Sequence, residues 1–198
     1  MGSFRVGILA VLLALSACSS SEQGSPTAQA GTGTTTASTP QPAPTTTKTT
    51  TQSTRPRTID LKAFDPCRIM EKIRPEVGLP EKPLTPEKSV AFPGSATCIQ
   101  TTAGSGPSLQ VLPILSLGLA DYALSYQVST PLTLEGFPAL LLEGNYQNDC
   151  YVGVDVADGQ TFSIQWTITV PNGKPAMSDV CAAATKAATA AMKVLVAS

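Results

Sequence analysis

Apolar and polar residues alternate along segment 160–170 in the way that a half-buried β-strand requires. One face is apolar and the other carries hydroxyl and amide groups, which predicts a sheet that is buried on one side. A similar segment, 149–156, precedes it, and Ala157-Asp158-Gly159 lies between the two as a turn. This order predicts an antiparallel hairpin. The apolar positions of the second arm are Phe162, Ile164, Trp166, Ile168 and Val170.

Three further segments, 96–102, 108–117 and 138–143, have the composition of strands. Pro113 lies inside the second of these and suggests a sheet edge or a bulge, because proline cannot donate a ladder hydrogen bond. Segment 81–88 is polar and rich in proline, and we interpret it as a loop.

The first predicted helix begins at Asp65-Pro66-Cys67. An aspartate can cap the free backbone N–H groups, and proline suits the first helical position. Pro75 and then Gly78 are expected to end this helix. Its apolar residues recur at helical spacing and are Ile69, Met70, Ile73 and Val77.

Two more helices are predicted, a short one at 119–127 and a long one at 177–196. Alanine dominates the long helix, and Ser178 or Asp179 is expected to cap it. Its small residues permit a close approach to the sheet, so we expect an α+β fold: an antiparallel sheet covered by an N-terminal and a C-terminal helix. The predicted inner face is Val180, Ala184, Ala187, Ala188, Ala191, Met192 and Leu195.

The N-terminus resembles the signal peptide of a bacterial lipoprotein. Arg5 precedes an apolar run from Val6 to Leu15, which is much shorter than the roughly 20 residues of a membrane-spanning helix. Leu15-Ser16-Ala17-Cys18 resembles a lipobox. We therefore predict a signal peptide at 1–17, acylation of Cys18, and a lipid anchor on the extracytoplasmic face of the cell membrane; an ordinary signal peptide is the alternative.

Thr, Ser and Pro dominate residues 19–57, which contain no large apolar side chain. Such a composition cannot bury enough surface to offset its ordering entropy, so we predict that residues 18–57 are the lipidated N-terminus and a disordered tether. The tether is either a bare spacer or an O-glycosylated stalk. Residues 58–198 are then one α+β domain by length.

Four cysteines remain in the predicted domain. In an exported protein an even number indicates disulfides, which here would be two. Sequence leaves three pairings open, although chain order favours Cys67 with Cys98 and Cys150 with Cys181, because each pairing would join a helix to the sheet. A four-thiolate zinc site is the alternative, but it prefers closely spaced ligand pairs, which are missing here.

Several motifs together resemble an actinobacterial lipoprotein family of unknown function. That resemblance implies anchoring outside the cytoplasm, paired cysteines and an α+β sandwich similar to the Mog1/PsbP-like folds. The family places a tryptophan two residues after the second cysteine, where this chain has Gln100. The motifs are the lipobox, Asp65-Pro66-Cys67, Cys98, Gly136-Phe137-Pro138-Ala139, Cys150-Tyr151-Val152-Gly153-Val154 and Cys181.

The chain contains no histidine, which excludes histidine-dependent catalysis and histidine metal ligands. Carboxylate pairs are conceivable at Asp155 with Asp158 and at Glu143 with Asp149, and calcium at Asp149, Asp155 and Asp158, but their spacing matches no established loop. Hairpin aspartates are usually turn formers. We expect no enzymatic activity and no cofactor, and we place Trp166 and the few other aromatic residues in the core rather than in a sugar-stacking platform.

The predicted domain has a mildly acidic balance and no basic patch, so nucleic acid is not an expected partner. Two roles remain. The protein is either a binding module for a lipid, a glycan or another small envelope ligand, or a non-catalytic accessory subunit that contacts an envelope protein. An apolar cavity would indicate the first role and an exposed apolar patch the second.

Overall fold

The computed structural model describes residues 54–146, 148–171 and 173–198. Seven antiparallel strands form one sheet in the order β1-β2-β3-β7-β6-β5-β4. The predicted hairpin is present, with its turn at Asp158-Gly159. The strands are β1 (Glu87–Lys88), β2 (Ala96–Thr101), β3 (Gly106–Ile114), β4 (Ser129–Leu134), β5 (Phe137–Glu143), β6 (Asp149–Ala157) and β7 (Gln160–Thr169).

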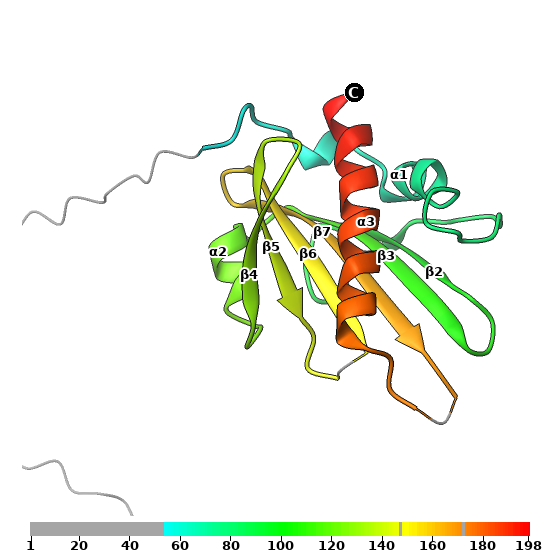
Figure 1. Ribbon diagram of the computed structural model, residues 1–198. Coiled ribbons are helices and arrows are strands. Elements are labelled where there is room, and N and C mark those ends of the chain that lie inside the picture. The colour runs from blue at the N-terminus through cyan, green and yellow to red at the C-terminus, as the bar shows by residue number, and fades with distance from the viewer. Residues whose placement is uncertain (1–53, 147, 172) are drawn as a thin grey trace, which may run out of the picture. The chain divides into compact units, whose positions relative to one another are not determined.

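Helix α3 crosses one face of this sheet, chiefly over β6 and β7 (Figure 1). Helix α1 contacts α3, β2 and β3, whereas the short α2 contacts β5, β6 and β7. The predicted α+β fold with an antiparallel sheet is confirmed. The helical segments are η1 (Leu61–Ala63, a 3-10 turn), α1 (Pro66–Ile73), α2 (Leu119–Ala123) and α3 (Met177–Val196).

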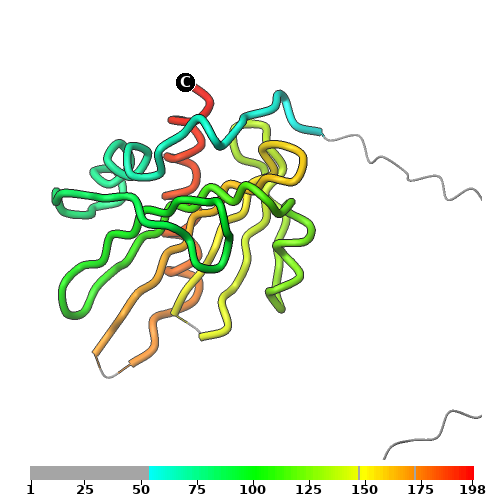
Figure 2. Tube along the Cα trace, turned by 180° about the vertical axis from the view of Figure 1, so that it is seen from behind, coloured from blue at the N-terminus to red at the C-terminus, as the bar shows by residue number. Residues whose placement is uncertain are grey.

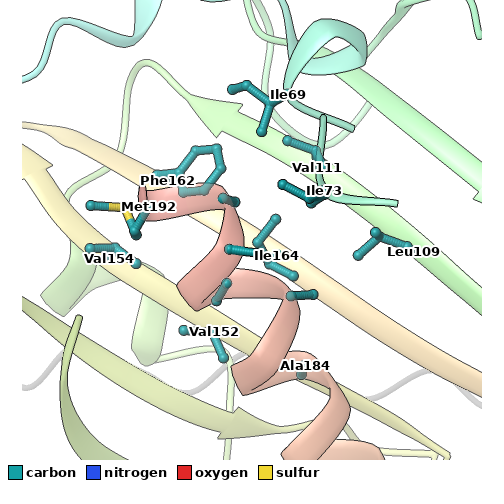
Figure 3. Close-up of a cluster of buried hydrophobic side chains, with 14 of the residues drawn as sticks. Ile69, Ile73, Leu109, Val111, Val152, Val154, Phe162, Ile164, Ala184 and Met192 are labelled. Carbon is teal, nitrogen blue, oxygen red and sulfur yellow. The ribbon is translucent and has the colours of Figure 1, made fainter. Parts of the chain in front are cut away.

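The main core lies between α3, α1 and what we call the α3 face of the sheet (Figure 3). Alternate residues of β3, β6 and β7 point into it, among them Val111, Val152 and Ile164. The small residues Ala184 and Ala188 of α3 are fully buried, so they let the helix lie close to the strands. Every residue of the predicted inner face of α3 is buried, and that prediction is confirmed.

Two disulfides close this core. Cys67 of α1 is bonded to Cys98 of β2, and Cys150 of β6 is bonded to Cys181 of α3. This is the pairing that chain order favours, and it removes the thiolates that the zinc alternative would need. Both bonds join residues 31 apart, and each ties a helix to the sheet.

The N-terminal cap of α1 agrees with the prediction, and the N-terminal cap of α3 differs from it. The Asp65 carboxylate accepts a hydrogen bond of 2.8 Å from the Cys67 backbone N–H, and Pro66 opens α1. The expected cap of α3 is wrong, because Ala176 is the N-cap residue and no side chain caps it. Asp179 instead lies in the first turn, where a carboxylate is favoured by the helix dipole.

Two strands are missing from the predictions. β4 is an edge strand that pairs with β5, and its exposed residues and Pro131 give it neither alternation nor an apolar run. β1 lies in the segment interpreted as a loop, where Glu87 pairs with Thr97 and Lys88 with Ala96.

Pro113 does not mark an edge strand, since β3 lies between β2 and β7. The ladder with β2 runs only to Val111, whereas the ladder with β7 continues through Pro113 to Ile114. The proline thus stands beyond the end of one ladder, where its lack of an N–H costs no hydrogen bond with β2.

Ordered contacts begin within the segment predicted as tether. Arg55 pairs with Asp155 at 2.5 Å and also with Asp158, and Arg57 donates a 2.6 Å hydrogen bond to the Val196 backbone oxygen of α3. The predicted signal peptide, Cys18 and the rest of the tether to residue 53 lie outside the described residues. In the described part of the chain, no helix is both long and apolar enough to cross a bilayer.

Candidate functional site

The face of the sheet opposite α3, which we call the open face, carries polar side chains in register across its central strands. Ile99 of β2 lies opposite Gln110 of β3, and Gln110 lies opposite Gln165 of β7. Gln165 in turn lies opposite Tyr151 of β6. Because directly opposed residues project from the same face, these side chains form one row that crosses four strands.

A second row runs beside the first, two residues further along each strand. Ser108 of β3 lies opposite Thr167 of β7, which lies opposite Asp149 of β6. The two rows thus place two amides, a phenol, two aliphatic hydroxyls and a carboxylate on neighbouring positions.

Three adjoining hollows lie over these rows, with volumes of about 440, 160 and 550 Å³. Gln165 lines all three, and we call the combined surface the trough. Seen from behind, α2 and the segment before β2 lie toward one end of this face, and the other end of β6 and β7 has no helix over it (Figure 2). Gln110, Gln165 and Tyr151 are each partly exposed, so the trough is open to solvent along the first row.

Aromatic rings form one wall of the trough. The centroids of Tyr122 and Tyr126 are 5.3 Å apart, and those of Tyr126 and Tyr151 are 4.9 Å apart. Phe92 extends the chain of rings, with its centroid 5.9 Å from that of Tyr122. Tyr122 is buried, whereas Tyr126 and Tyr151 are half-buried and line the hollow of 440 Å³.

Gly153 of β6 lies under α2, and its lack of a side chain allows the aromatic wall to form. A Cβ atom added there would lie 2.7 Å from Cδ1 of Leu119 and 3.3 Å from Cδ1 of Tyr122. Both distances are tighter than an ordinary van der Waals contact, so glycine is needed for α2 to approach the sheet this closely.

Hydrogen bonds hold the polar groups of the trough in place. Gln165 donates through Nε2 to the Tyr151 hydroxyl at 2.7 Å, and that hydroxyl donates to Oδ2 of Asp149 at 2.7 Å. Tyr126 donates to the Tyr122 hydroxyl at 2.8 Å. Each ring and amide is therefore fixed before any ligand arrives, which lowers the entropic cost of binding.

Asp149 is the one acidic residue among the polar rows, and it is only 4 % exposed. Its Oδ1 atom is buried and has no hydrogen-bond partner among the described residues. The carboxylate packs on Gly144, where an added Cβ would lie 2.1 Å from Oδ1. An unsatisfied buried acceptor beside a hollow is the kind of group that a donor from water or a ligand satisfies.

Burial raises the pKa of Tyr122, Tyr126 and Tyr151 above the usual tyrosine value. For Tyr151, the hydrogen bond to Asp149 and the charge of that carboxylate raise the pKa further. The three phenols consequently stay protonated near neutral pH and offer neutral hydroxyl groups to the trough.

Of the two carboxylate pairs considered from the sequence, only Asp155 with Asp158 comes together, through a shared cationic partner. Glu143 lies opposite Cys150, whose disulfide is on the α3 face, so Glu143 and Asp149 project from opposite faces of the sheet. Asp155 and Asp158 pair with Arg55 and stand apart from Asp149. Among the residues that the structure describes, no group of three acids and cysteines could hold a metal ion.

Trp166 belongs to the core, as predicted, because it projects into the α3 face and is only 5 % exposed. The tyrosines of the trough were missed, although Tyr122 and Tyr126 are four residues apart in the segment predicted as a short helix. That spacing places two rings on one side of a helical turn, and it is the signal that could have identified them.

Two other concave surfaces lie away from the trough. The larger, about 790 Å³, runs along α3 beside β5 and includes Leu141, Thr185 and Lys186. The other, about 590 Å³, lies near Arg55 and the start of α2.

A family model described as "Protein of unknown function (DUF3558)" matches residues 13–193. No curated protein and no solved structure matches the chain. The match covers the whole sheet and nearly all of α3, so both faces of the fold are features of the matched region.

Proposed function

The chain belongs to the DUF3558 family, whose function is unknown, and on that premise we propose that this protein is a lipid-anchored ligand-binding module of the cell envelope. Acylated Cys18 holds it on the extracytoplasmic face of the membrane, and the tether lets the domain stand away from the bilayer. We further propose that its fold is similar to the Mog1/PsbP-like sandwiches, as its α+β architecture suggests.

The trough is the observation that carries this proposal. It is concave, and hydrogen bonds fix the amide of Gln165 and the hydroxyl of Tyr151 within it. Concave surfaces with a few fixed polar groups and aromatic walls are typical of ligand sites. This differs from the apolar cavity between helix and sheet that the sequence led us to look for.

Binding suits the lining of the trough better than catalysis does. A hydrolytic pair needs two carboxyl groups that face each other, and a nucleophile needs an adjacent base. Asp149 is the only carboxylate among the polar rows, and its partner there is the neutral phenol of Tyr151.

The two disulfides support a location outside the cytoplasm, since such bonds persist in oxidising compartments. The anchor is tested by Cys18→Ala. We expect the unmodified chain to remain with membranes in an alkaline carbonate wash and the variant to be released. Retention of the variant at the unmodified level would contradict acylation at this residue.

The second candidate role is that of an accessory subunit in an envelope protein complex. Exposed apolar side chains favour it, and Val90 and Tyr146, at 97 % and 83 % exposed, line the two ends of the trough. Such side chains at a rim suit a protein partner as well as a small ligand.

Photo-crosslinking in living cells separates these roles. We would replace Gln110, in the trough, with a photoreactive phenylalanine analogue, and Lys186, in the concave surface along α3 beside β5, with the same analogue as a control. A small-molecule adduct from position 110 alone supports the binding module. A discrete protein adduct from position 110 supports the accessory subunit, and equal labelling at both positions or none contradicts a site in the trough.

A further inference from the structure

We propose that the ligand of the trough is a neutral glycan, bound as a short oligosaccharide that lies across the strands. This inference rests on the proposed function and names the chemical class of its ligand. It is carried by the geometry of the polar rows, the half-buried rings and the composition of the lining.

The first row has the length of an oligomer rather than of a single sugar. Ile99, Gln110, Gln165 and Tyr151 stand on four adjacent strands. Since neighbouring strands are about 4.8 Å apart, the row extends roughly 14 Å. The three hollows follow one another across this surface and share Gln165, so a chain of several sugar rings can lie along them.

The half-buried rings of Tyr126 and Tyr151 supply the apolar part of such a site. A pyranose ring presents C–H groups on one side and hydroxyl groups at its edge, which suits an amphipathic aromatic side chain. Both rings are held by hydrogen bonds from their hydroxyl groups, to Tyr122 and Asp149 respectively. They therefore offer fixed surfaces for stacking.

The two amides supply the polar part. Gln110 donates to the Thr97 hydroxyl at 2.9 Å and Gln165 donates to the Tyr151 hydroxyl at 2.7 Å. In the described part of the chain, the Oε1 atoms of both amides accept no hydrogen bond. A planar amide with an available acceptor matches vicinal sugar hydroxyl groups, which are donors and acceptors at once.

Charge in the trough favours a neutral ligand over an anionic one. The described lining residues include no arginine, and Asp149 places a carboxylate beside the central row. Lys88 and Lys174 are at opposite ends, too far apart on the lining to form one anion site. Phosphate and carboxylate ligands are typically held by arginine forks, which this surface lacks.

A lipid chain or an extended peptide fits less well. A lipid chain requires a continuous apolar passage. Phe92, Ile99 and Leu112 line the hollow of 440 Å³, but amide and hydroxyl side chains interrupt the apolar surface beyond it. An extended peptide binds by adding its backbone to an unpaired sheet edge. The centre of the trough lies on β3, β7 and β6, whose backbones are paired on both sides, and only Ile99 of its first row lies on the outer strand β2.

The test is calorimetric titration of the purified full chain with chitotetraose, maltotetraose, mannotetraose and, as an anionic comparison, tetragalacturonate. We expect at least one neutral oligosaccharide to bind and the anionic one to bind at least tenfold more weakly. Tyr126→Ala and Gln165→Ala should each weaken binding about tenfold, whereas Tyr126→Phe, which keeps the ring, should stay within about threefold.

Lys186→Ala, in the concave surface along α3 on the other side of the sheet, is the control and should leave the affinity unchanged. Thermal unfolding of each variant shows that lost binding does not come from lost folding. Tighter binding of the anionic oligosaccharide, or equal affinity of all variants, would overturn the inference.

The glycan inference and the proposed function fail in different ways. If no neutral oligosaccharide binds but the crosslinker at position 110 captures another small molecule, the ligand class is wrong and the binding module stands. If the crosslinker captures nothing and no oligosaccharide binds, both are wrong.

Discussion

The two faces of the central strands have opposite chemistry although the same strands form both. On β7, Ile164 points into the α3 face and is fully buried, while its neighbour Gln165 points into the trough and is half-buried. On β6, Val152 likewise points into the α3 face and is buried, while its neighbour Tyr151 lines the trough. Because side chains alternate along a strand, one sheet can separate the residues that stabilise the fold from those that meet a ligand.

The faces also differ in how they are closed. Two disulfides and a long helix seal the α3 face, whereas α2 and one loop cover only part of the open face. In the described part of the chain, buried polar atoms without a hydrogen-bond partner occur on both faces, for example Trp166 Nε1 on the α3 face and Asp149 Oδ1 on the open face.

The largest expected effect comes from Phe162→Ala, which removes a fully buried ring from the α3 face. Truncation of a buried phenylalanine typically costs about 3–5 kcal/mol of unfolding free energy. Gln165→Ala, three residues away on the open face, should cost less than about 1 kcal/mol. Chemical denaturation measures both, and equal losses would contradict the division between the faces.

Removal of either disulfide should be the next largest effect. The double variants Cys67→Ala/Cys98→Ala and Cys150→Ala/Cys181→Ala each open a loop between residues 31 apart. Loss of loop constraint should lower the unfolding free energy by about 3–4 kcal/mol in each case. Since the loops are equally long, a difference between the two variants would measure how unequally α1 and α3 depend on their bonds to the sheet.

Gly153→Ala tests how closely α2 packs on the open face. The added methyl group meets Leu119 and Tyr122, so we expect a loss of about 1–3 kcal/mol from overpacking. The shift of α2 should also displace the wall of tyrosines and weaken ligand binding. Gly173→Ala is the control, because its Cβ would meet only Val170 at 3.9 Å, and thermal unfolding should not distinguish it from the unmodified chain.

The smallest effect concerns alkaline pH. Burial raises the folded-state pKa of Tyr122, Tyr126 and Tyr151, so their protonated forms favour folding. This stability is fully present below the unfolded-state value of about 10 and is lost as pH rises above it. Tyr151→Phe should make the unfolding free energy less dependent on pH between 9 and 11. The exposed Tyr146→Phe should not, and a reversed order would contradict the burial of Tyr151.

Much of the α3 face could be predicted from sequence, because burial leaves regular patterns. The alternation of apolar and polar residues in 160–170 predicted the sheet, and the small residues of 177–196 predicted the inner face of α3. β4 could not be predicted in the same way, since an exposed edge strand with Pro131 has no apolar period.

The trough was harder to predict because its rows depend on register between distant segments. Gln110 and Gln165 are separated in sequence by α2, β4, β5 and β6, and only the pairing of β3 with β7 sets them side by side. The hydroxyl-rich face was visible in the sequence, but a solvated face and a binding face have the same pattern. The residues that distinguish them, Tyr122 and Tyr126, come from outside the strands.

The most direct test of the account is the position of a bound oligosaccharide. In the full chain with a neutral tetrasaccharide from the titration bound, nuclear Overhauser contacts should connect the sugar C–H protons with the ring protons of Tyr126 and Tyr151. Contacts with Leu141 or Thr185, on the α3 side of the sheet, would contradict the assignment of binding to the open face.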